Sequence, residues 1–320
     1  MPLRIIFMGT AELACASLKA LLNSPEFAVQ AVVTQPDRPK GRDLKLQPSE
    51  VKRVAVETNI PVLQPERARE PQFVEQLKQF APDYIVVIAY GQILPKAILE
   101  TPKLGCVNVH TSLLPKYRGA APIQAALLNG DAETGVTVML MDEGLDTGPI
   151  ISQWAIPIDA TDNAATLHDK LALVGAELLL PTLIDFASGR LKAKAQDHAQ
   201  AMHVKKIKKE DGQLDFTQPA RVLQNRIRAF TPWPGAFTFQ RTNDKARLLK
   251  IWRAEVVSGQ GEPGTVLKAG NTGIVVACGV DALRVERLQR EGGRQMGAAE
   301  FLQGNPIRVG EQLVTSSSKS

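Results

Sequence analysis

An asparagine and a histidine stand two positions apart at the end of a short apolar run. Asn108 and His110 close the stretch Cys106–His110, whose composition predicts a β-strand. Alternate residues of a strand point to the same face, so both side chains are expected on one side of the sheet. An amide donor beside a titratable imidazole stabilises a developing oxyanion and moves a proton, and acyl transfer requires both. The alternative interpretation is a polar strand end capped by local hydrogen bonds.

An acidic loop after the next expected strand offers partners for the histidine. Asp142, Glu143 and Asp146 lie in a stretch that also holds two glycines and a proline. Such a composition predicts a loop. A carboxylate bonded to imidazole fixes the tautomer of the ring and raises its basicity. The residue types do not select among the three acids, and solvated acidic side chains are the ordinary alternative.

These polar groups need a sheet that brings strand ends together. Several apolar runs read as strands, and amphipathic stretches between them read as helices. The expected strands are Leu3–Met8, Val29–Thr34, Tyr84–Ala89, Cys106–His110 and Gly135–Leu140, and the expected helices are Ala11–Leu22, Pro71–Phe80 and Ala120–Leu128. Buried strands with helical crossovers predict an α/β fold with a Rossmann-like parallel sheet covered on both sides. Ligands of such sheets bind at the carboxyl ends of the strands.

Gly9 follows the first expected strand, at the position where nucleotide-binding loops begin. Neither the G-x-G-x-x-G pattern nor the P-loop pattern is present there. The sequence therefore gives no support for a nicotinamide cofactor or ATP. We expect Gly9 to serve a tight turn from strand to helix, where it also lets a ligand approach the sheet edge.

The second half of the chain changes in character. A long helix is expected over Ala164–Ala187, broken or kinked near Pro181 and closed by Ser188 and Gly189. The run Leu191–Lys209 is rich in Lys, Ala and Gln and predicts an exposed linker.

Beyond this run, a helix near Pro219–Phe230 precedes several short strands separated by turn residues. The expected strands are Phe237–Gln240, Leu248–Glu255, Gly264–Leu267, Gly273–Ala277 and Ala282–Leu288. Strands at this spacing predict a small antiparallel barrel. We therefore expect a first domain over residues 1–191, a basic linker over 192–209 and a barrel domain over 210–320.

Composition excludes several classes of protein and separates the two halves by charge. Three scattered cysteines without a CxxC pair argue against a disulfide framework or a structural zinc site. The first residues lack the long apolar core of a signal peptide, and no segment reaches membrane-spanning length, so we expect a soluble cytoplasmic protein. Residues 1–191 carry a net charge of −4 and residues 192–320 a net charge of +9, within a total of +5. A basic second half favours a polyanionic partner, although a solubilising surface is the alternative.

The segment from Asn108 to Gly119 resembles the signature of 10-formyltetrahydrofolate-dependent formyltransferases. The run Leu145–Gly148 resembles the second catalytic loop of that family. Within the family, the chain is most similar to the members that formylate methionyl-tRNA. The supporting segments are Val33–Arg42, Ala89–Pro95, Gly119–Gln124, Lys208–Gly212 and Arg228–Gly235. The resemblance extends in register from about residue 4 to at least residue 300.

The resemblance implies roles for particular residues. It assigns Asn108, His110 and Asp146 as the catalytic trio, and so selects one of the three acids. The folate pocket would be lined by Ser112, Leu113, Leu114 and Pro115. The basic residues expected to contact tRNA are Arg38, Lys40, Arg42, Lys45, Lys205, Lys206, Lys208 and Lys209, with Arg42 reaching the acceptor end. It also implies an OB-like barrel after the catalytic domain.

The implied reaction moves the formyl group of 10-formyltetrahydrofolate to the amino group of methionyl initiator tRNA, which serves translation initiation. The co-substrate is a folate, no metal is needed, and we expect a monomer without a membrane partner. The same signature also serves formyl transfer to amino sugars or purine precursors and formyl-folate hydrolysis, but these activities leave the basic barrel unexplained. A non-catalytic tRNA-binding module is the alternative from another class, and the joint presence of Asn108, His110 and Asp146 speaks against it.

Overall fold

The structure, a computed structural model, describes residues 1–40, 45–242 and 245–314 of the chain. The chain divides into two compact units that do not follow the sequence in two simple blocks. The first unit holds Met1–Pro122, Glu133–Pro157 and His168–Val204, and the second holds Ile123–Ala132, Ile158–Leu167 and the residues from Lys205 onward. The domain boundaries expected from composition stay a prediction.

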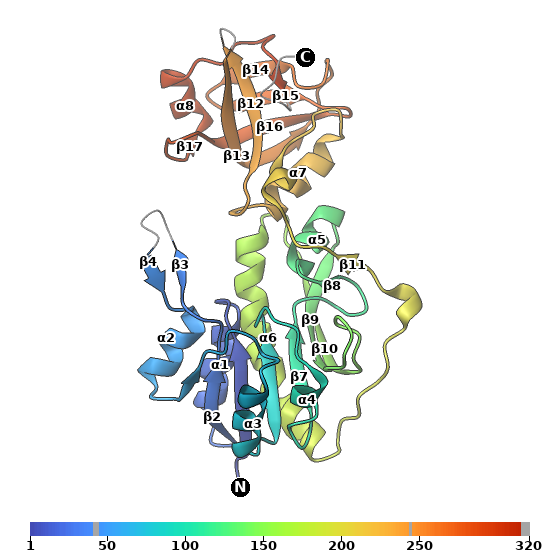
Figure 1. Ribbon diagram of the computed structural model, residues 1–320. Helices are drawn as coiled ribbons and strands as arrows, with labels where there is room; N and C mark the ends of the chain where they lie inside the picture. Colours follow the sequence, from blue (N-terminus) through green and yellow to red (C-terminus); the bar gives the residue numbers. More distant parts are fainter. Residues whose placement is uncertain (41–44, 243–244, 315–320) are drawn as a thin grey trace. The chain divides into compact units, whose positions relative to one another are not determined.

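A seven-stranded sheet forms the centre of the first unit (Figure 1). Its strand order is β10-β9-β7-β6-β1-β2-β5. The strands are β1 (Leu3–Gly9), β2 (Phe27–Val33), β5 (Val62–Leu63), β6 (Tyr84–Ile88), β7 (Cys106–His110), β9 (Glu133–Leu140) and β10 (Ile150–Pro157). All five residues of β6 are buried, whereas the edge strand β10 is mostly exposed or half-buried. Apolar runs therefore occupy the centre of the sheet, where both faces are covered.

The expected parallel sheet is correct for one part of this sheet only. The pairings from β7 through β6, β1 and β2 to β5 are parallel. The strand β9 runs antiparallel to β7, and β10 runs antiparallel to β9. The strand β10 was not expected from sequence, because its exposed face interrupts the apolar pattern. A short loop joins β9 to β10, and so short a connection permits only antiparallel neighbours.

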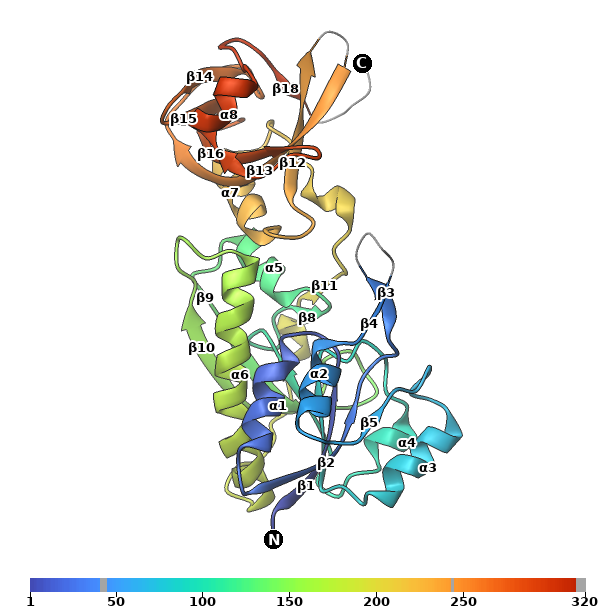
Figure 2. The same ribbon diagram turned by 90° about the vertical axis from the view of Figure 1, so that its left-hand side faces the viewer.

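Helices cover both faces of the sheet (Figure 2). On one face lie α1 (Ala14–Leu22) and α6 (Ala164–Ala187), and on the other lie α3 (Pro71–Gln79) and α4 (Lys96–Leu99). The Tyr84 hydroxyl of β6 donates a 3.0 Å hydrogen bond to the Leu183 carbonyl of α6. Buried side chains of α3 and α4 pack with those of β1 and β6 in one apolar cluster. The helix α2 (Glu50–Glu57), unexpected from sequence, is capped by Ser49, whose hydroxyl accepts from Lys52 N.

The long helix α6 has the expected bounds. Pro181 lies within it, and the helix continues through this residue, so of the expected break or kink the break is absent. Gly189 follows the helix with φ of +76° and supplies the left-handed residue that commonly ends a helix. None of the helices in the described ranges is both long and apolar enough to cross a membrane.

Two small strand pairs lie at the edge of the first unit. The strands β3 (Arg38–Lys40) and β4 (Lys45–Gln47) form an antiparallel hairpin, which is not among the strands expected from sequence. The strands β8 (Arg118–Gly119) and β11 (His203–Val204) pair in parallel. The second pair attaches the end of the expected linker to the signature segment.

The second unit contains a β-structure of the expected kind. Its path is β14-β15-β16-β13-β12-β18, with β17 pairing beside β16. The strands are β12 (Ala236–Thr242), β13 (Lys245–Val257), β14 (Val266–Gly270), β15 (Gly273–Ala277), β16 (Ala282–Arg290), β17 (Met296–Gly297) and β18 (Leu313–Val314). The helices of this unit are α5 (Pro122–Asn129), α7 (Ala220–Ala229) and α8 (Ala298–Gly304).

Hydrogen bonds close this sheet into a barrel. Val266 N donates to the Glu311 carbonyl, and Leu313 N donates to the Gly264 carbonyl, each at 2.8 Å. The chain around β18 therefore joins the first strand of the path to the last, which removes the open edges. Leu249, Val285 and Phe301 are buried in one apolar cluster of the barrel.

Candidate active site

The strand β7 carries Asn108 and His110 on one face, as their spacing predicts. In the sheet Asn108 is paired with Val87 of β6 and Met139 of β9, and His110 is paired with Thr137. His110 is 7% exposed, and Asn108 is half-buried. Within the described residues, the Asn108 amide has no internal hydrogen-bond partner, so it remains available to a ligand.

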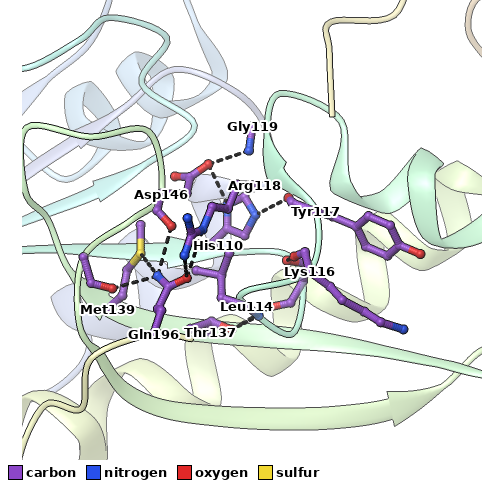
Figure 3. Close-up of polar contacts among 12 residues, drawn as sticks. His110, Leu114, Lys116, Tyr117, Arg118, Gly119, Thr137, Met139, Asp146 and Gln196 are labelled. Carbon is purple, nitrogen blue, oxygen red and sulfur yellow. Dashed lines mark hydrogen bonds and ion pairs between the residues drawn. The ribbon is translucent and has the colours of Figure 1, made fainter. Parts of the chain in front are cut away.

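The three acids of the β9–β10 loop have different surroundings, and Figure 3 shows those of Asp146. The Asp142 carboxylate accepts from Gly144 N and from the Thr147 hydroxyl, so it closes a local turn. Glu143 is exposed. The Asp146 carboxylate is 10% exposed, and its Oδ2 lies 3.7 Å from His110 Nδ1. Asp146 is therefore the acid that faces the imidazole.

The His110 ring is held between two acceptors. Its Nε2 lies 2.9 Å from the Tyr117 carbonyl, and a carbonyl only accepts, so Nε2 carries a proton in this arrangement. The distance of 3.7 Å from Nδ1 to the Asp146 carboxylate is too long for a hydrogen bond but suits an ion pair. If Nδ1 also carried a proton, the positive ring would lie beside a carboxylate in a nearly buried site, where water weakens their attraction little.

Two backbone positions beside His110 adopt a conformation that side chains disfavour. Tyr117 has φ of +60° and Asp146 has φ of +54°. A non-glycine residue in this region costs roughly 1–3 kcal/mol and persists where the surroundings hold it. Asp146 is held because its Oδ2 accepts from Gly119 N at 2.7 Å. The strain thus coincides with the group that faces the imidazole.

The carboxyl ends of the parallel strands are linked to one another. Thr10, which follows β1, donates to the Tyr90 carbonyl beyond β6 at 3.0 Å. Gln35, which follows β2, donates to the same carbonyl at 2.9 Å. A Cβ on Gly9 would lie 3.1 Å from the Ile88 carbonyl and 2.9 Å from the Phe7 ring, so the crowded turn favours glycine. This edge is the side of the sheet where ligands bind in such folds.

A buried threonine and a glutamine brace the loop expected to bind folate. The Thr137 hydroxyl donates to the Ser112 carbonyl at 2.6 Å and accepts from Leu114 N at 3.1 Å. Gln153 Nε2 donates to the Leu114 carbonyl at 2.9 Å. Sequence reasoning missed both braces: Thr137 is the single polar residue of the expected strand Gly135–Leu140, and Gln153 lies in the unexpected strand β10.

The four residues expected to line the folate pocket differ in exposure. Ser112 and Leu114 are buried, and the Ser112 hydroxyl donates to the Lys116 carbonyl at 2.6 Å. Leu113 and Pro115 are half-buried. Contact of all four with folate stays a prediction, and the two buried residues have an evident role in shaping the loop.

The expected tRNA-binding residues occupy exposed positions wherever the structure describes their side chains. Arg38 of β3 is exposed, and so are the four lysines of the linker, Lys205, Lys206, Lys208 and Lys209. The backbone of Lys40 and Lys45 lies in β3 and β4. Arg42 lies outside the described residues. The exposed positions suit contact with phosphates, but they do not identify a ligand.

The expected exposed linker contains one buried residue that sequence reasoning missed. Gln196 is 6% exposed, although most of its neighbours are exposed. It contacts Arg118, which is 2% exposed, and the carbonyl of Asp146. The sequence signal was weak, because one glutamine in a run rich in Lys, Ala and Gln carries no pattern. In the described part of the chain, no group of three His, Cys, Asp or Glu side chains is arranged to hold a metal ion.

Comparison with known proteins gives the family of both halves of the chain. Residues 3–183 match the formyl transferase family, and residues 206–306 match the formyl transferase C-terminal domain. The chain is 49% identical over 311 residues to a methionyl-tRNA formyltransferase of Trichlorobacter lovleyi, covering 97% of each chain. It is 51% identical over 309 residues to a methionyl-tRNA formyltransferase of Myxococcus xanthus, again covering 97% of each chain.

Solved structures share the fold at lower identity. An N-formyltransferase from Helicobacter canadensis, in complex with folinic acid and dTDP-3-aminofucose, matches with a TM-score of 0.62 and 20% identity, over 91% of this chain and 100% of that one. HypX from Aquifex aeolicus in complex with tetrahydrofolic acid matches with a TM-score of 0.63 and 18% identity, over 98% of this chain and 51% of that one. At this identity the similarity concerns the fold alone. The two family matches and the close relatives over nearly the whole length show that the chain belongs to the methionyl-tRNA formyltransferase family.

Proposed function

We propose that this protein transfers the formyl group of 10-formyltetrahydrofolate to the amino group of methionyl initiator tRNA. The observation that carries the proposal is the near-half identity to methionyl-tRNA formyltransferases across almost the whole chain. The grouping of Asn108, His110 and Asp146 at the carboxyl edge of the sheet supports it. These three residues supply a free amide, an imidazole and a carboxylate, which are the groups that acyl transfer needs.

In the proposed reaction, the amine of the methionyl ester attacks the formyl carbon, and negative charge builds on the formyl oxygen. The Asn108 amide has no internal partner among the described residues, so it can donate to this oxygen without breaking another hydrogen bond. Removal of one such donor typically costs about 2.7–4 kcal/mol in the barrier. His110 donates to the Tyr117 carbonyl through Nε2, so it would donate to the formyl oxygen only by releasing that carbonyl.

The attacking amine loses a proton and the departing folate nitrogen gains one. The carboxylate of Asp146 would stabilise the protonated His110 ring from 3.7 Å and keep its plane fixed between two acceptors. An orienting carboxylate beside an acid–base histidine is a recurrent arrangement in acyl transfer. We assign the proton transfer to His110 and Asp146 together.

The proposed RNA substrate requires cations as well as a reactive site. The exposed lysines from Lys205 to Lys209 and the β3–β4 hairpin supply positive charge in a chain whose second half is basic. Lys and Arg contacts to phosphate fix the position of a nucleic acid without reading its sequence. We propose that Arg42 contacts the acceptor end of the tRNA and that the protein acts as a monomer in the cytoplasm.

A direct transfer assay tests the function. The protein is supplied with 10-formyltetrahydrofolate labelled on the formyl group, and with charged initiator tRNA, charged elongator tRNA, free methionine or an amino sugar. We expect label on the charged initiator tRNA far above the other acceptors. Preferential labelling of the sugar amine, or release of formate without an acceptor, would reject the proposed substrate. Sedimentation of the same preparation tests the monomer.

A further inference from the structure

Arg118 is a buried cation whose hydrogen-bond partners are neutral. Its Nε and Nη2 donate to Gln196 Oε1 at 3.1 and 2.7 Å, and its Nη1 lies 3.2 Å from His198 Nδ1. A guanidinium only donates, so His198 Nδ1 accepts in this arrangement. Burial of a charge without an opposite charge costs stability. The position of Arg118 therefore indicates a role beyond stability.

Gln196 uses both ends of its amide in this contact (Figure 3). Its oxygen accepts from Arg118, and its Nε2 donates to the Asp146 carbonyl at 3.0 Å and to the Gly148 carbonyl at 2.7 Å. An amide nitrogen has two protons, so both are engaged. Replacement of this residue by a side chain without a hydrogen-bond donor would remove this partner from both carbonyls.

The two carbonyls belong to the strained part of the β9–β10 loop. Asp146 adopts φ of +54°, and a Cβ on Gly148 would lie 1.8 Å from the Leu140 carbonyl. The loop thus has little freedom on the side of β9. On its other side, the donors of Gln196 hold the carbonyls on either side of Thr147.

The contacts around Asp146 form a closed ring. Its carbonyl is bound by Gln196, its carboxylate is bound by Gly119 N at 2.7 Å, and Gly119 is joined by a peptide bond to Arg118, which binds Gln196. The backbone and the side chain of Asp146 therefore depend on the same two-residue strand β8.

The segment that carries Gln196 is fixed on both sides of this residue. Before it, Lys194 exchanges two backbone hydrogen bonds of 2.8 Å with Ile150 of β10. After it, β11 pairs with β8, and Arg118 N donates to the Met202 carbonyl at 2.8 Å. The linker thus reaches the acid loop at a defined register.

We propose that Gln196 and Arg118 are positioning residues that hold the Asp146 carboxylate against His110. This inference rests on the proposed function, because it assumes that Asp146 takes part in formyl transfer. Gln196 does not touch the substrate. It fixes the backbone of Asp146, so its loss would let the carboxylate leave the imidazole while both substrates still bind.

The variant Gln196→Glu separates positioning from general stability. One oxygen of the new carboxylate accepts from Arg118 and compensates its buried charge, so the fold is retained. The other oxygen faces the carbonyls of Asp146 and Gly148 without a proton to donate, so the loop is released. We expect kcat to fall roughly tenfold to a hundredfold, as a displacement of about 1 Å causes in other enzymes. KM for folate and for tRNA should change by less than about threefold, because substrate contacts elsewhere are intact.

The matched control is Gln200→Glu, which adds the same charge four residues further along the linker. Gln200 is exposed, and its side-chain amide donates to Asp197. We expect wild-type kcat and KM from this control. An equal loss of kcat in both variants would overturn the proposal, since a negative charge on the linker would then explain the loss by itself.

A double-mutant cycle with Asp146→Asn tests whether Gln196 acts through Asp146. If it does, Gln196→Glu combined with Asp146→Asn should be as slow as Asp146→Asn alone, because the carboxylate being positioned is already absent. Losses that multiply would overturn the positioning role. Wild-type kcat in Asp146→Asn would instead reject the role of Asp146 in the proposed function, so the two failures are distinguishable.

Thermal unfolding shows whether each variant is folded and can be used in the double-mutant cycle. If Gln196→Glu is unfolded, the pair Gln196→Met with Arg118→Met replaces it, because this pair removes the buried charge and the amide together. The same loss of kcat, again absent on an Asp146→Asn background, is expected from the pair. A folded variant of either kind with wild-type kcat would overturn the proposal.

Discussion

The catalytic trio and the basic residues differ in how firmly the structure holds them. His110 and Asp146 are nearly buried. The Tyr117 carbonyl holds the imidazole, and Gly119 N and the Gln196 amide hold Asp146. Arg38 and the linker lysines are exposed. Bond formation requires atoms placed within a fraction of an ångström, whereas attraction to phosphate acts over about 8–10 Å at ordinary salt. Substitutions should therefore alter kcat in the first region and mainly KM in the second.

The largest effect is expected from Asp146→Asn. Asparagine keeps the size of the side chain and accepts from Gly119 N, but it removes the negative charge from beside His110. We expect kcat to fall by roughly two to three orders of magnitude. Single-turnover formylation and equilibrium tRNA binding give the two quantities. The contrast between the regions would be broken by a variant with most of its turnover intact, or by one that binds tRNA poorly.

The second largest effect is expected from Arg42→Ala. It sharpens the contrast between the two regions, because Arg42 is a basic residue that is proposed to affect both kcat and KM. A simple phosphate contact would weaken all tRNAs alike and leave kcat unchanged. A contact with the open acceptor end would reduce kcat/KM for initiator tRNA by about tenfold or more, with part of the loss in kcat, because the amine would move away from the formyl carbon. We expect the second result. Lys45→Ala, assayed with initiator and elongator tRNA at two salt concentrations, is the control. Equal losses on both tRNAs would leave Arg42 as a phosphate contact.

A smaller effect is expected from the double variant Lys205→Ala and Lys206→Ala. Both side chains are exposed, so their removal should leave the catalytic trio undisturbed. We expect KM to rise for initiator and elongator tRNA alike, kcat to stay unchanged, and the slope of log affinity against log salt to fall by about 2. Titration of tRNA at several salt concentrations measures the slope. An unchanged slope would show that these lysines do not meet phosphate.

The smallest effect is expected at the base of the β3–β4 hairpin. Hydrogen bonds to the Asp37 carboxylate, first from Lys52 Nζ at 2.7 Å and then from Gln64 Nε2 at 2.8 Å, lower the pKa of Asp37. Because the pKa of Asp37 is lowered, this contact stabilises the hairpin at pH values above the ordinary carboxyl pKa. The stabilisation is lost as the pH falls through the lowered pKa. Lys52→Met should raise the pKa of Asp37, measured by carbon NMR of its carboxyl group. Initiator formylation at neutral pH should change by less than about twofold, because ion pairs that water still reaches contribute little. A pKa that does not respond to Lys52→Met would assign the shift to another cause.

Much of the fold was predictable because local pattern and burial agree. The strands β6, β7 and β15 lie where apolar runs predict them, and α6 has the predicted bounds. The strand β10 and the closing segment at β18 were not predictable in this way. Half of β10 faces outward at the sheet edge, and β18 is only two residues long, so neither carries a periodic pattern. The direction of β9 depends on its neighbours, which local sequence does not specify.

The sequence by itself determined that Asn108 and His110 share a face, because the side-chain period of a strand is two. By resemblance it also identified the family and singled out Asp146. Only the tertiary structure decided how Asp146 reaches His110. Loop side chains take their direction from backbone angles and distant partners, here φ of +54° and the contacts with Gly119 and Gln196. Gln196 lies 50 residues from Asp146 in the chain, and no local pattern encodes a contact across that separation.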